Sequence, residues 1–298
     1  MRLAYTVKQL TVNDVKVLRA IERGMPTYEY VPLEFIERYS KLKPNDLSYS
    51  IIKLNKMKLI RRRFGSYVGY MLTPLGYDCL ALKSLIERNI VSALGPKLGV
   101  GKESDVYEAL TPTGLMVTVK IHKVGRVSFR HTRRWRTYTV DKPNVSWLIE
   151  SKIAAEREYT ALNLAYNAKV HVPKPIARDR HIVVTEYIDG VLLAKYKDAV
   201  DPESLLYTIL DDIRKTYLEA KIVHGDLSEY NILVKLVGEV EEPLIIDWPQ
   251  YVDVTHPSAE NLLKRDVEYI VKYFYRRYSI RVDVLKALDY VRGRIERI

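Results

Sequence analysis

The stretch HGDLSEYNILV, residues 224–234, constrains this chain more than any other part of it. It sets Asp226 and Asn231 five residues apart and runs into a predicted hairpin, ILVKLVGEVEEPLIID, whose apolar second strand ends at Asp247. Phosphoryl transfer requires a group that steers the attacking hydroxyl and oxygen atoms that hold a metal ion. Two carboxylates and one amide in this order therefore predict a site for phosphate chemistry.

Length and composition describe a globular chain with room for two domains. It has 298 residues, of which 47% are hydrophobic and 29% charged, and a chain of this length can bury two separate cores. No apolar run approaches a membrane span, and the N-terminus lacks the apolar core of a signal peptide, so we expect a cytoplasmic protein. The single cysteine, Cys79, excludes an internal disulfide and a cysteine-cluster metal site.

Positive charge is concentrated in two segments. Residues 1–90 contain 16 Lys and Arg against 8 Asp and Glu, whereas the rest contains 32 against 29. No acid lies between Asp46 and Asp78, and none lies in the basic segment 121–140. Such unmixed segments favour a polyanionic partner over a surface on which both signs are interspersed. In the first segment the candidate phosphate contacts are Lys53, Lys56, Arg61, Arg62 and Arg63.

Residues 1–92 have the pattern of a winged helix. Helical spacing of apolar residues predicts three helices, over 12–21, 31–40 and 46–60. Two short strands over 59–73 follow, and Pro74 begins a last helix. In a winged helix the third helix can enter a nucleic-acid groove and the hairpin can touch the backbone, although this helix pattern is equally compatible with a protein partner.

Residues 93–298 predict a reduced bilobal protein-kinase-like domain, so the whole chain is α+β. Glycine-punctuated strands, a long amphipathic helix and further strands form a first lobe over about 93–187. The second lobe, about 188–298, contains a helix, the 224–234 loop, its hairpin and two C-terminal helices. We expect ATP and a metal ion to bind between the two lobes.

The glycine-rich loop of the first lobe is the predicted phosphate cradle. Its two glycines allow backbone amides to approach a phosphate, and Ser104 adds a hydroxyl donor. Alone, this pattern is also typical of an ordinary hairpin turn. The residues predicted to bind the nucleotide are Gly99, Gly101, Lys102, Ser104, Val106, Lys120, Glu158, Glu186 and Ile188.

Lys120, Asp226 and Asp247 are the predicted catalytic residues. Lys120 ends the apolar strand MVTVK, where a buried ammonium needs an anionic partner. We expect phosphates and Glu158 to provide it, with Glu156 as the alternative. Asp226 would steer the proton of the attacking hydroxyl, and Asn231 and Asp247 would ligate Mg²⁺, with Mn²⁺ possible. His224 is predicted to be structural, and the backbone of Glu186 and Ile188 to pair with adenine.

Taken together, these residues resemble the RIO atypical protein kinases and, within them, the subfamily with an N-terminal winged helix. The resemblance covers nearly the whole chain. The family's lysine, loop aspartate, loop asparagine and metal-binding aspartate correspond to Lys120, Asp226, Asn231 and Asp247. The segments that carry it most specifically are GVGKESDVY (99–107), HGDLSEYNILV (224–234), IIDWPQ (245–250) and LTPLGYDCLALKSL (72–85).

The resemblance implies a role beyond the residues themselves. Members of this family act in the maturation of the small ribosomal subunit near rRNA. They phosphorylate serine, including their own, and behave as ATPases whose metal-binding aspartate is transiently phosphorylated. It also implies that 125–146 is a flexible loop near the active site.

Two departures from ordinary protein kinases indicate a narrow substrate range. Gly225 replaces the usual arginine of the catalytic loop, and Asp247 is followed by Trp-Pro-Gln with no A-P-E motif. Two other functions fit parts of the sequence. A small-molecule kinase of the aminoglycoside or choline type shares the H-G-D-L-x-x-x-N and I-D-W motifs, and a winged-helix nucleic-acid regulator with a weak kinase domain shares the N-terminal pattern.

Overall fold

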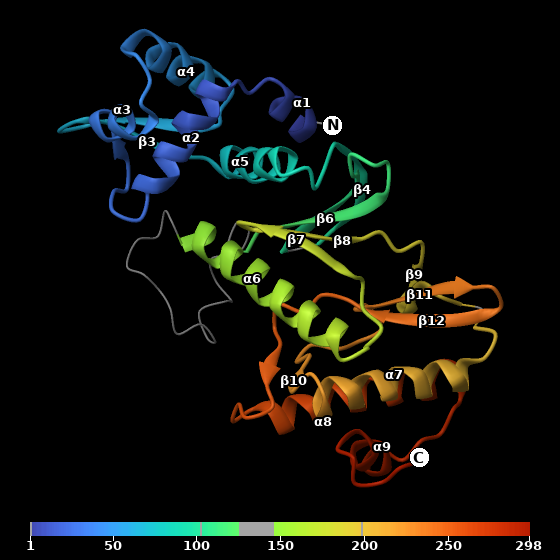
Figure 1. The fold of residues 1–298 in the computed structure, drawn as a ribbon. Coiled ribbons are helices and arrows are strands. Elements are labelled where there is room, and N and C mark those ends of the chain that lie inside the picture. Colours follow the sequence, from blue (N-terminus) through green and yellow to red (C-terminus); the bar gives the residue numbers. More distant parts are fainter. Residues whose placement is uncertain (1, 102, 125–145, 198) are drawn as a thin grey trace. The chain divides into compact units, whose positions relative to one another are not determined.

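A computed structural model describes residues 2–101, 103–124, 146–197 and 199–298. The chain divides into two compact units (Figure 1). Unit 1 consists of 1–153 together with 178–182, and unit 2 consists of 154–177 together with 183–298. Within the described ranges, no helix is both long enough and apolar enough to cross a membrane.

The N-terminal part of unit 1 is a winged helix, as predicted. Thr11 begins the second helix with a capping box, in which its hydroxyl accepts from the Asp14 N–H and Asp14 accepts from the Thr11 N–H. Two features were not expected from the sequence: a first helix and a two-residue strand that makes the hairpin a three-stranded sheet, β1-β3-β2. The elements are α1 Arg2–Lys8, α2 Val12–Gly24, β1 Val31–Pro32, α3 Leu33–Ser40, α4 Pro44–Lys56, β2 Ile60–Phe64, β3 Val68–Leu72 and α5 Pro74–Glu87.

Burial on one side of each winged-helix element makes its core. The α2 side chains that recur at helical spacing, Val15, Leu18 and Ile21, are almost fully buried. Helix α5 is buried along most of its length, including Cys79, whose pKa is raised to about 12 by burial. Cys79 is therefore a small core residue, as its apolar context predicts.

The rest of unit 1 is a meander of three antiparallel strands, β4 Ala93–Val100, β5 Ser104–Leu110 and β6 Met116–His122. Gly114, at φ 82°, lies in the turn between β5 and β6. Side chains alternate between a buried and a half-exposed face along β5. The sheet order is β4-β5-β6-β8-β7, and the turn 178–182, which joins β7 (Pro175–Asp179) to β8 (Ile182–Glu186), belongs to unit 1.

The turn 178–182 is bound to the winged helix by charged and polar side chains. Arg180 donates two hydrogen bonds to Glu22 of α2, at 2.6 and 2.7 Å. His181, which is fully buried, lies 2.7 Å from Asp78 of α5 and stacks on Tyr77. The Ser84 hydroxyl of α5 donates to Asp179 at 2.6 Å. Unit 1 therefore contains both the winged helix and the first strands of the second domain.

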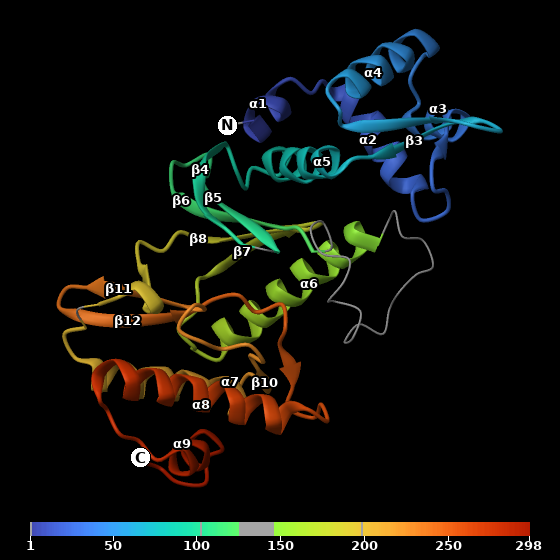
Figure 2. The same ribbon diagram turned by 180° about the vertical axis from the view of Figure 1, so that it is seen from behind.

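Unit 2 is mainly helical and carries the catalytic loop. Figures 1 and 2 both show α7 and α8 side by side beneath the hairpin of β11 and β12. Trp248 and Phe274 are among its largest fully buried side chains. Its elements are the end of α6 (Ser146–Asn167), β9 Val191–Leu192, η2 Leu193–Lys195, α7 Pro202–Leu218, β10 Ile222–Val223, β11 Ile232–Val237, β12 Val240–Ile245, β13 Val252–Asp253, α8 Ala259–Tyr278 and α9 Val284–Val291.

Candidate active site

One face of the β5–β6 pair collects the predicted nucleotide contacts of unit 1. Val106 lies opposite Lys120 and Ser104 lies opposite His122 in the antiparallel register. Because directly opposite residues point to the same side of a sheet, Ser104, Val106 and Lys120 share one face. That face is half-exposed along β5, whereas Asp105 and Tyr107 lie on the buried side.

The glycine-rich loop makes a tight turn at the edge of this face. The Gly101 N–H donates to the Ser104 carbonyl at 2.8 Å, which closes the turn. A Cβ at Gly99 would meet no atom within 4 Å, so the backbone there is open to a ligand. Lys102, another predicted contact, lies outside the described residues, as does segment 125–145, which includes most of the basic segment 121–140.

In unit 2, the hairpin brings the two predicted metal ligands together. Ile232 pairs with Ile245 at the base of the hairpin, and the Ile246 N–H donates to the Asn231 carbonyl at 2.9 Å. Asp247, the next residue, is therefore beside Asn231. The Asn231 side-chain N–H donates to the Asp226 carbonyl at 2.7 Å, which leaves the amide oxygen as the atom suited to a cation.

Asp247 has a left-handed backbone conformation, with φ 68°. Non-glycine residues occupy this region at a steric cost and do so mostly where the surrounding structure imposes it, often at functional sites. The next residue, Trp248, imposes this conformation on Asp247. Trp248 is fully buried, and its indole N–H donates to the Ile245 carbonyl at 3.1 Å. The tryptophan therefore anchors the chain immediately after the predicted metal ligand.

The chain beyond Trp248 is held by Arg157 of α6. The Arg157 guanidinium donates to the Pro249 carbonyl at 2.9 Å and also to the Tyr251 carbonyl. Its planar group lies over the Tyr251 ring, 4.7 Å from the centroid. The short segment that follows Asp247 is thus tied back to a helix. Sequence reasoning missed Arg157, which is one of two basic residues of α6 and belongs to no motif.

The glycine that replaces the usual arginine is required by the backbone. Gly225 has φ 79°, and a Cβ there would lie 3.0 Å from the Gln250 carbonyl oxygen. Its N–H donates to Asp266 at 2.7 Å, and its carbonyl accepts from Arg265. Positive φ and the close backbone approach each favour glycine at this position.

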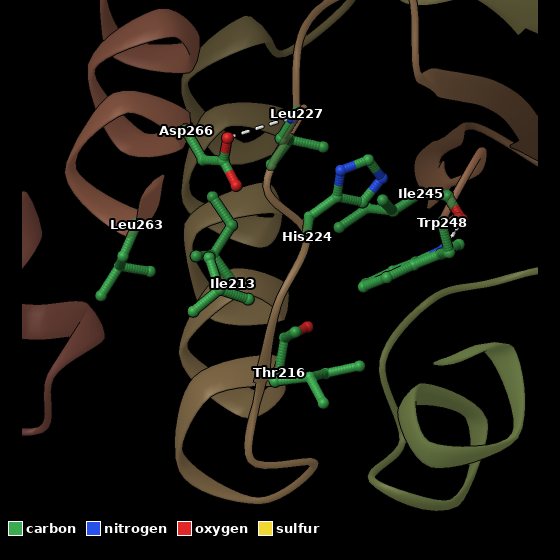
Figure 3. A pocket seen from close by; sticks show the side chains of 10 residues that line it. Ile213, Thr216, His224, Leu227, Ile245, Trp248, Leu263 and Asp266 are labelled. Atoms are coloured by element: carbon green, nitrogen blue, oxygen red, sulfur yellow. Dashed lines mark hydrogen bonds between the residues drawn. The ribbon is translucent and has the colours of Figure 1, made fainter. Parts of the chain in front are cut away.

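Asp266 of α8 organises the loop around Asp226. Its carboxylate accepts from the Gly225 N–H and, at 3.1 Å, from the Leu227 N–H, on the residues before and after Asp226. Figure 3 shows the bond to Leu227. Asp266 is 1% exposed, and burial raises its pKa to about 7. No local pattern points to this residue, because its partners lie 41 and 39 positions away in the chain.

His224 lies beneath the catalytic loop, in the structural position that the sequence predicts. Its Nε2 is 3.1 Å from the Ile246 carbonyl, and its Nδ1 accepts from the Asp226 N–H at 3.3 Å. These contacts assign the proton to Nε2. The ring packs against Trp248, with centroids 4.6 Å apart. The cavity drawn in Figure 3 has a volume of about 10 Å³, no more than one water requires, so it is a gap in the core.

The remaining predicted contacts are divided between the units. Glu158 is 4% exposed whereas Glu156 is exposed, which favours Glu158 as the acid of α6 that needs a cationic partner. Lys120 itself is half-exposed and not buried as expected. Lys120 belongs to unit 1 and Glu158 to unit 2. The Glu186 N–H donates to the Lys174 carbonyl at 3.0 Å, so the Glu186 carbonyl is the backbone group suited to adenine. The Ile188 role stays a prediction.

In the described residues, no group of three or more His, Cys, Asp and Glu side chains could hold a metal ion by itself. Asn231 and Asp247 would supply two oxygen ligands. Magnesium is typically bound by one or two protein oxygens, with phosphates and water completing the octahedron. The donor set therefore fits a Mg²⁺ ion that arrives with a nucleotide better than a permanent metal centre.

The basic surface of the winged helix is smaller than the sequence predicts. The Lys53 ammonium is 2.5 Å from buried Asp14 and also donates to the Gln9 carbonyl, so it is a structural residue and not a free phosphate contact. Arg63 pairs with Glu29 at 3.2 Å. The Arg62 guanidinium lies 4.0 Å from the ring centroid of Phe64, which is 71% exposed.

Comparison with known proteins adds independent findings. The family model "Rio2, N-terminal" matches residues 7–88, and the model "RIO domain" matches residues 105–287. The chain is 39% identical to the RIO-type serine/threonine-protein kinase Rio2 of Methanocaldococcus jannaschii, covering 90% of this chain and 99% of the relative. It is 37% identical to the rio2 kinase of Schizosaccharomyces pombe, covering 93% and 80%.

The fold is also similar to a solved structure. The Rio2 kinase of Chaetomium thermophilum in an ADP/Mg²⁺-phosphoaspartate complex superposes with a TM-score of 0.84 at 32% identity, covering 98% of this chain and 93% of that one. The expected order, a winged helix followed by a kinase-like domain, is therefore confirmed.

Proposed function

Because the chain belongs to the RIO family of serine/threonine protein kinases, we propose that it binds ATP with Mg²⁺ and uses them for serine phosphorylation and ATP hydrolysis. The solved relative from Chaetomium thermophilum is described as a complex with ADP, Mg²⁺ and phosphoaspartate. In this chain, the observation that supports the proposal most directly is the hydrogen bond from Ile246 to Asn231, which sets Asp247 beside Asn231. Manganese would fit the same oxygen ligands.

The residues of each unit have separate tasks in this proposal. Ser104 and Lys120, on one face of the β5–β6 pair, bind phosphate oxygens. Asn231 and Asp247 hold the magnesium ion, which when bound neutralises charge on the phosphates. Asp226 accepts or steers the proton of an attacking hydroxyl. Its backbone is held because its carbonyl accepts from Asn231 and because the N–H groups of its neighbours, Gly225 and Leu227, donate to Asp266.

We propose that Asp247 also accepts the phosphoryl group. One Asp247 carboxylate oxygen forms a bond to the γ-phosphorus while the bond from this phosphorus to the bridging oxygen breaks, and ADP leaves with that oxygen. Water then cleaves the acyl phosphate, restores the carboxylate and releases inorganic phosphate. The left-handed backbone of Asp247 supports this role, because it fixes how the side chain leaves the chain.

Extended peptides are poor acceptors in this proposal. The segment after Asp247 is short, and Arg157 ties it to α6 through two carbonyls. Ordinary kinases use a long activation segment as the platform for peptides. A restricted set of serines, including serines of the chain itself, is therefore the proposed protein substrate, and ATP hydrolysis is the main activity.

The biological setting that we propose is cytoplasmic maturation of the small ribosomal subunit, with rRNA as a partner. The wing of the N-terminal domain supports it, because Arg61 and Arg62 are exposed and Arg62 stacks on the exposed Phe64 ring. Basic and aromatic side chains together suit a nucleic acid, which offers phosphates and stacking faces.

The chemical proposal is tested with Asp247→Asn, Asp226→Asn and γ-labelled ATP. The wild-type protein should acquire a label that hydroxylamine removes, since acyl phosphates react with it and phosphoserine does not. Asp247→Asn should lose this label and ATP hydrolysis. Asp226→Asn should bind nucleotide normally but transfer far less phosphate to serine. Continued hydrolysis by Asp247→Asn would disprove the assigned role of Asp247.

The partner proposal needs a separate experiment. RNA that co-purifies with the protein should be enriched in precursors of the small-subunit rRNA. A plot of log affinity against log salt has a negative slope, and for Arg62→Gln this slope should be shallower by about one. Arg19→Gln is the matched control, because Arg19 already pairs with Glu87 on α5 at 2.6 Å. An affinity that does not depend on salt, or RNA of no common origin, would contradict the RNA assignment.

A further inference from the structure

The buried carboxylate of Asp105 is bound by three side chains in unit 1. Asp105 follows Ser104 directly and is 2% exposed. The Lys97 ammonium lies 2.9 Å from Oδ2, and the Lys123 ammonium binds the same oxygen. The Tyr107 hydroxyl is 3.4 Å from it. A single oxygen therefore gathers donors from β4, from β5 and from the residue after β6.

Asp105 does not face the nucleotide side of the sheet. Side chains alternate along β5, so Asp105 and Tyr107 point to the buried side while Ser104 and Val106 point to the half-exposed side that carries Lys120. An effect of Asp105 on nucleotide binding must therefore act through the backbone. That backbone is the glycine-rich turn 99–104, whose last residue, Ser104, precedes Asp105.

The pairing of β4 with β5 is irregular where β4 enters the glycine-rich turn. The register of β4 with β5 shifts between Leu94 and Lys97 and again between Lys97 and Gly99. Lys97 is thus isolated between two irregularities, two residues before Gly99, the first glycine of the loop. Its ammonium bond to Asp105 spans this irregular region and fixes where β4 enters the loop.

The other end of the loop is fixed by the same carboxylate. Lys123 donates its backbone N–H to the Glu103 carbonyl at 2.6 Å, and its side chain reaches Asp105. Lys123 thus connects the chain after β6 to the backbone of Glu103 and to the side chain of Asp105. The two lysines hold opposite ends of the loop against one buried charge.

We propose that Asp105 is a positioning residue that sets the glycine-rich turn 99–104 in its phosphate-binding conformation through Lys97 and Lys123. The inference depends on the proposed function, in which this turn binds the nucleotide phosphates. Removal of the buried charge takes away the carboxylate that the two ammonium groups share, so nothing draws them together and the turn loses its fixed shape.

The direct test is the affinity of Asp105→Asn for ADP with Mg²⁺, measured by calorimetry. Asparagine keeps the size of the side chain and removes its charge. The dissociation constant for ADP should rise about tenfold or more, while kcat for ATP hydrolysis at saturating ATP should change less than about threefold, because the turn holds ground state and transition state alike.

Asp14→Asn is the matched control. Asp14 is also fully buried and paired with one lysine, Lys53, but it lies in the winged helix. Both variants lose a buried carboxylate from unit 1, so both should lower Tm. Only Asp105→Asn should weaken ADP binding. Equal weakening in both variants would show that Asp105 acts through stability alone and would overturn the proposal.

Lys97→Met and Lys123→Met provide the test if Asp105→Asn does not fold. Each single variant should weaken ADP binding less than the double variant does. Where Asp105→Asn does fold, adding it to the double variant should weaken ADP binding little further, because all three changes break one cluster. Additive effects, or normal ADP affinity in Lys97→Met and Lys123→Met combined, would overturn the inference. A wild-type protein that does not bind ADP would instead contradict the proposed function.

Discussion

The Asp266 carboxylate lies 2.7 Å from the backbone nitrogen of Gly225, which is 41 positions earlier in the chain. Its other oxygen accepts from the Leu227 N–H. A buried acid on α8 thus accepts from the N–H groups of the residues before and after Asp226, and the position of the proposed proton acceptor is set from a separate helix.

Asp266→Asn should reduce turnover more than it reduces nucleotide affinity. Asparagine can accept only through its carbonyl oxygen, so one of the two loop amides loses its partner and Asp226 becomes less well positioned. We expect kcat to fall about 10- to 100-fold with little change in the dissociation constant for ADP. Steady-state kinetics and calorimetry measure the two quantities. A loss of ADP affinity with unchanged kcat would contradict this role.

Asp266 should also give the stability of the protein a pH dependence. Burial raises its pKa from 3.8 to about 7, so the folded state binds the proton more tightly than the unfolded state. The stabilisation from this group is complete below pH 3.8 and is lost as pH rises through about 7, an effect of up to about 4 kcal/mol. Denaturant unfolding at pH 5 and pH 8 should show the part of this loss that falls above pH 5, about 3 kcal/mol, in the wild type and not in Asp266→Asn.

Gly225→Ala should lower Tm more than Gly114→Ala does, although both glycines have a positive φ. At Gly225 the added Cβ has both an unfavourable φ of 79° and a contact of 3.0 Å with the Gln250 carbonyl. Gly114 has φ 82° but open space around its Cβ position, so Gly114→Ala measures the conformational cost alone. That cost is about 1–2 kcal/mol. We expect a lower Tm and lower kcat for Gly225→Ala, and equal Tm shifts would exclude the contact as a cause.

Trp248→Phe, which introduces the aromatic residue of ordinary kinases, should destabilise unit 2. Trp248 is fully buried, donates to the Ile245 carbonyl and packs against His224. Phenylalanine removes the donor and leaves space next to the existing gap in the core. We expect a loss of about 1–3 kcal/mol by denaturant unfolding. Phe274→Leu, in the same core but away from the loop, is the control for packing loss without an effect on kcat.

The parts of the site that could be predicted from sequence are those set by local spacing. The hairpin after residue 231 places Asn231 beside Asp247, from a pattern a few residues long. Lys120 was expected to be buried, but it lies on the half-exposed face of the β5–β6 pair. Asp266 and Arg157 could not be predicted, because they meet the loop through packing over about 40 and 90 positions.

The charge pattern was a poorer guide, since it does not show which basic residues are already paired. Lys53 looked like a phosphate contact in an acid-free segment, but its partner Asp14 lies 39 positions away on α2. Lys123 belongs to the basic segment 121–140 that predicted a polyanionic partner, but together with Lys97 it converges on one buried acid, Asp105.

The attachment of the turn 178–182 to α2 and α5 changes how a shortened protein should be interpreted. A chain that begins at residue 93 would keep Arg180 and His181 but lose Glu22 and Asp78, their partners. A buried or half-buried polar group that loses a partner is costly, so the strands on either side of the turn would be destabilised. The winged helix, which ends near residue 92, shares its compact unit with these strands. Loss of ATP hydrolysis on truncation would report a weakened β-sheet, whatever the winged helix itself binds.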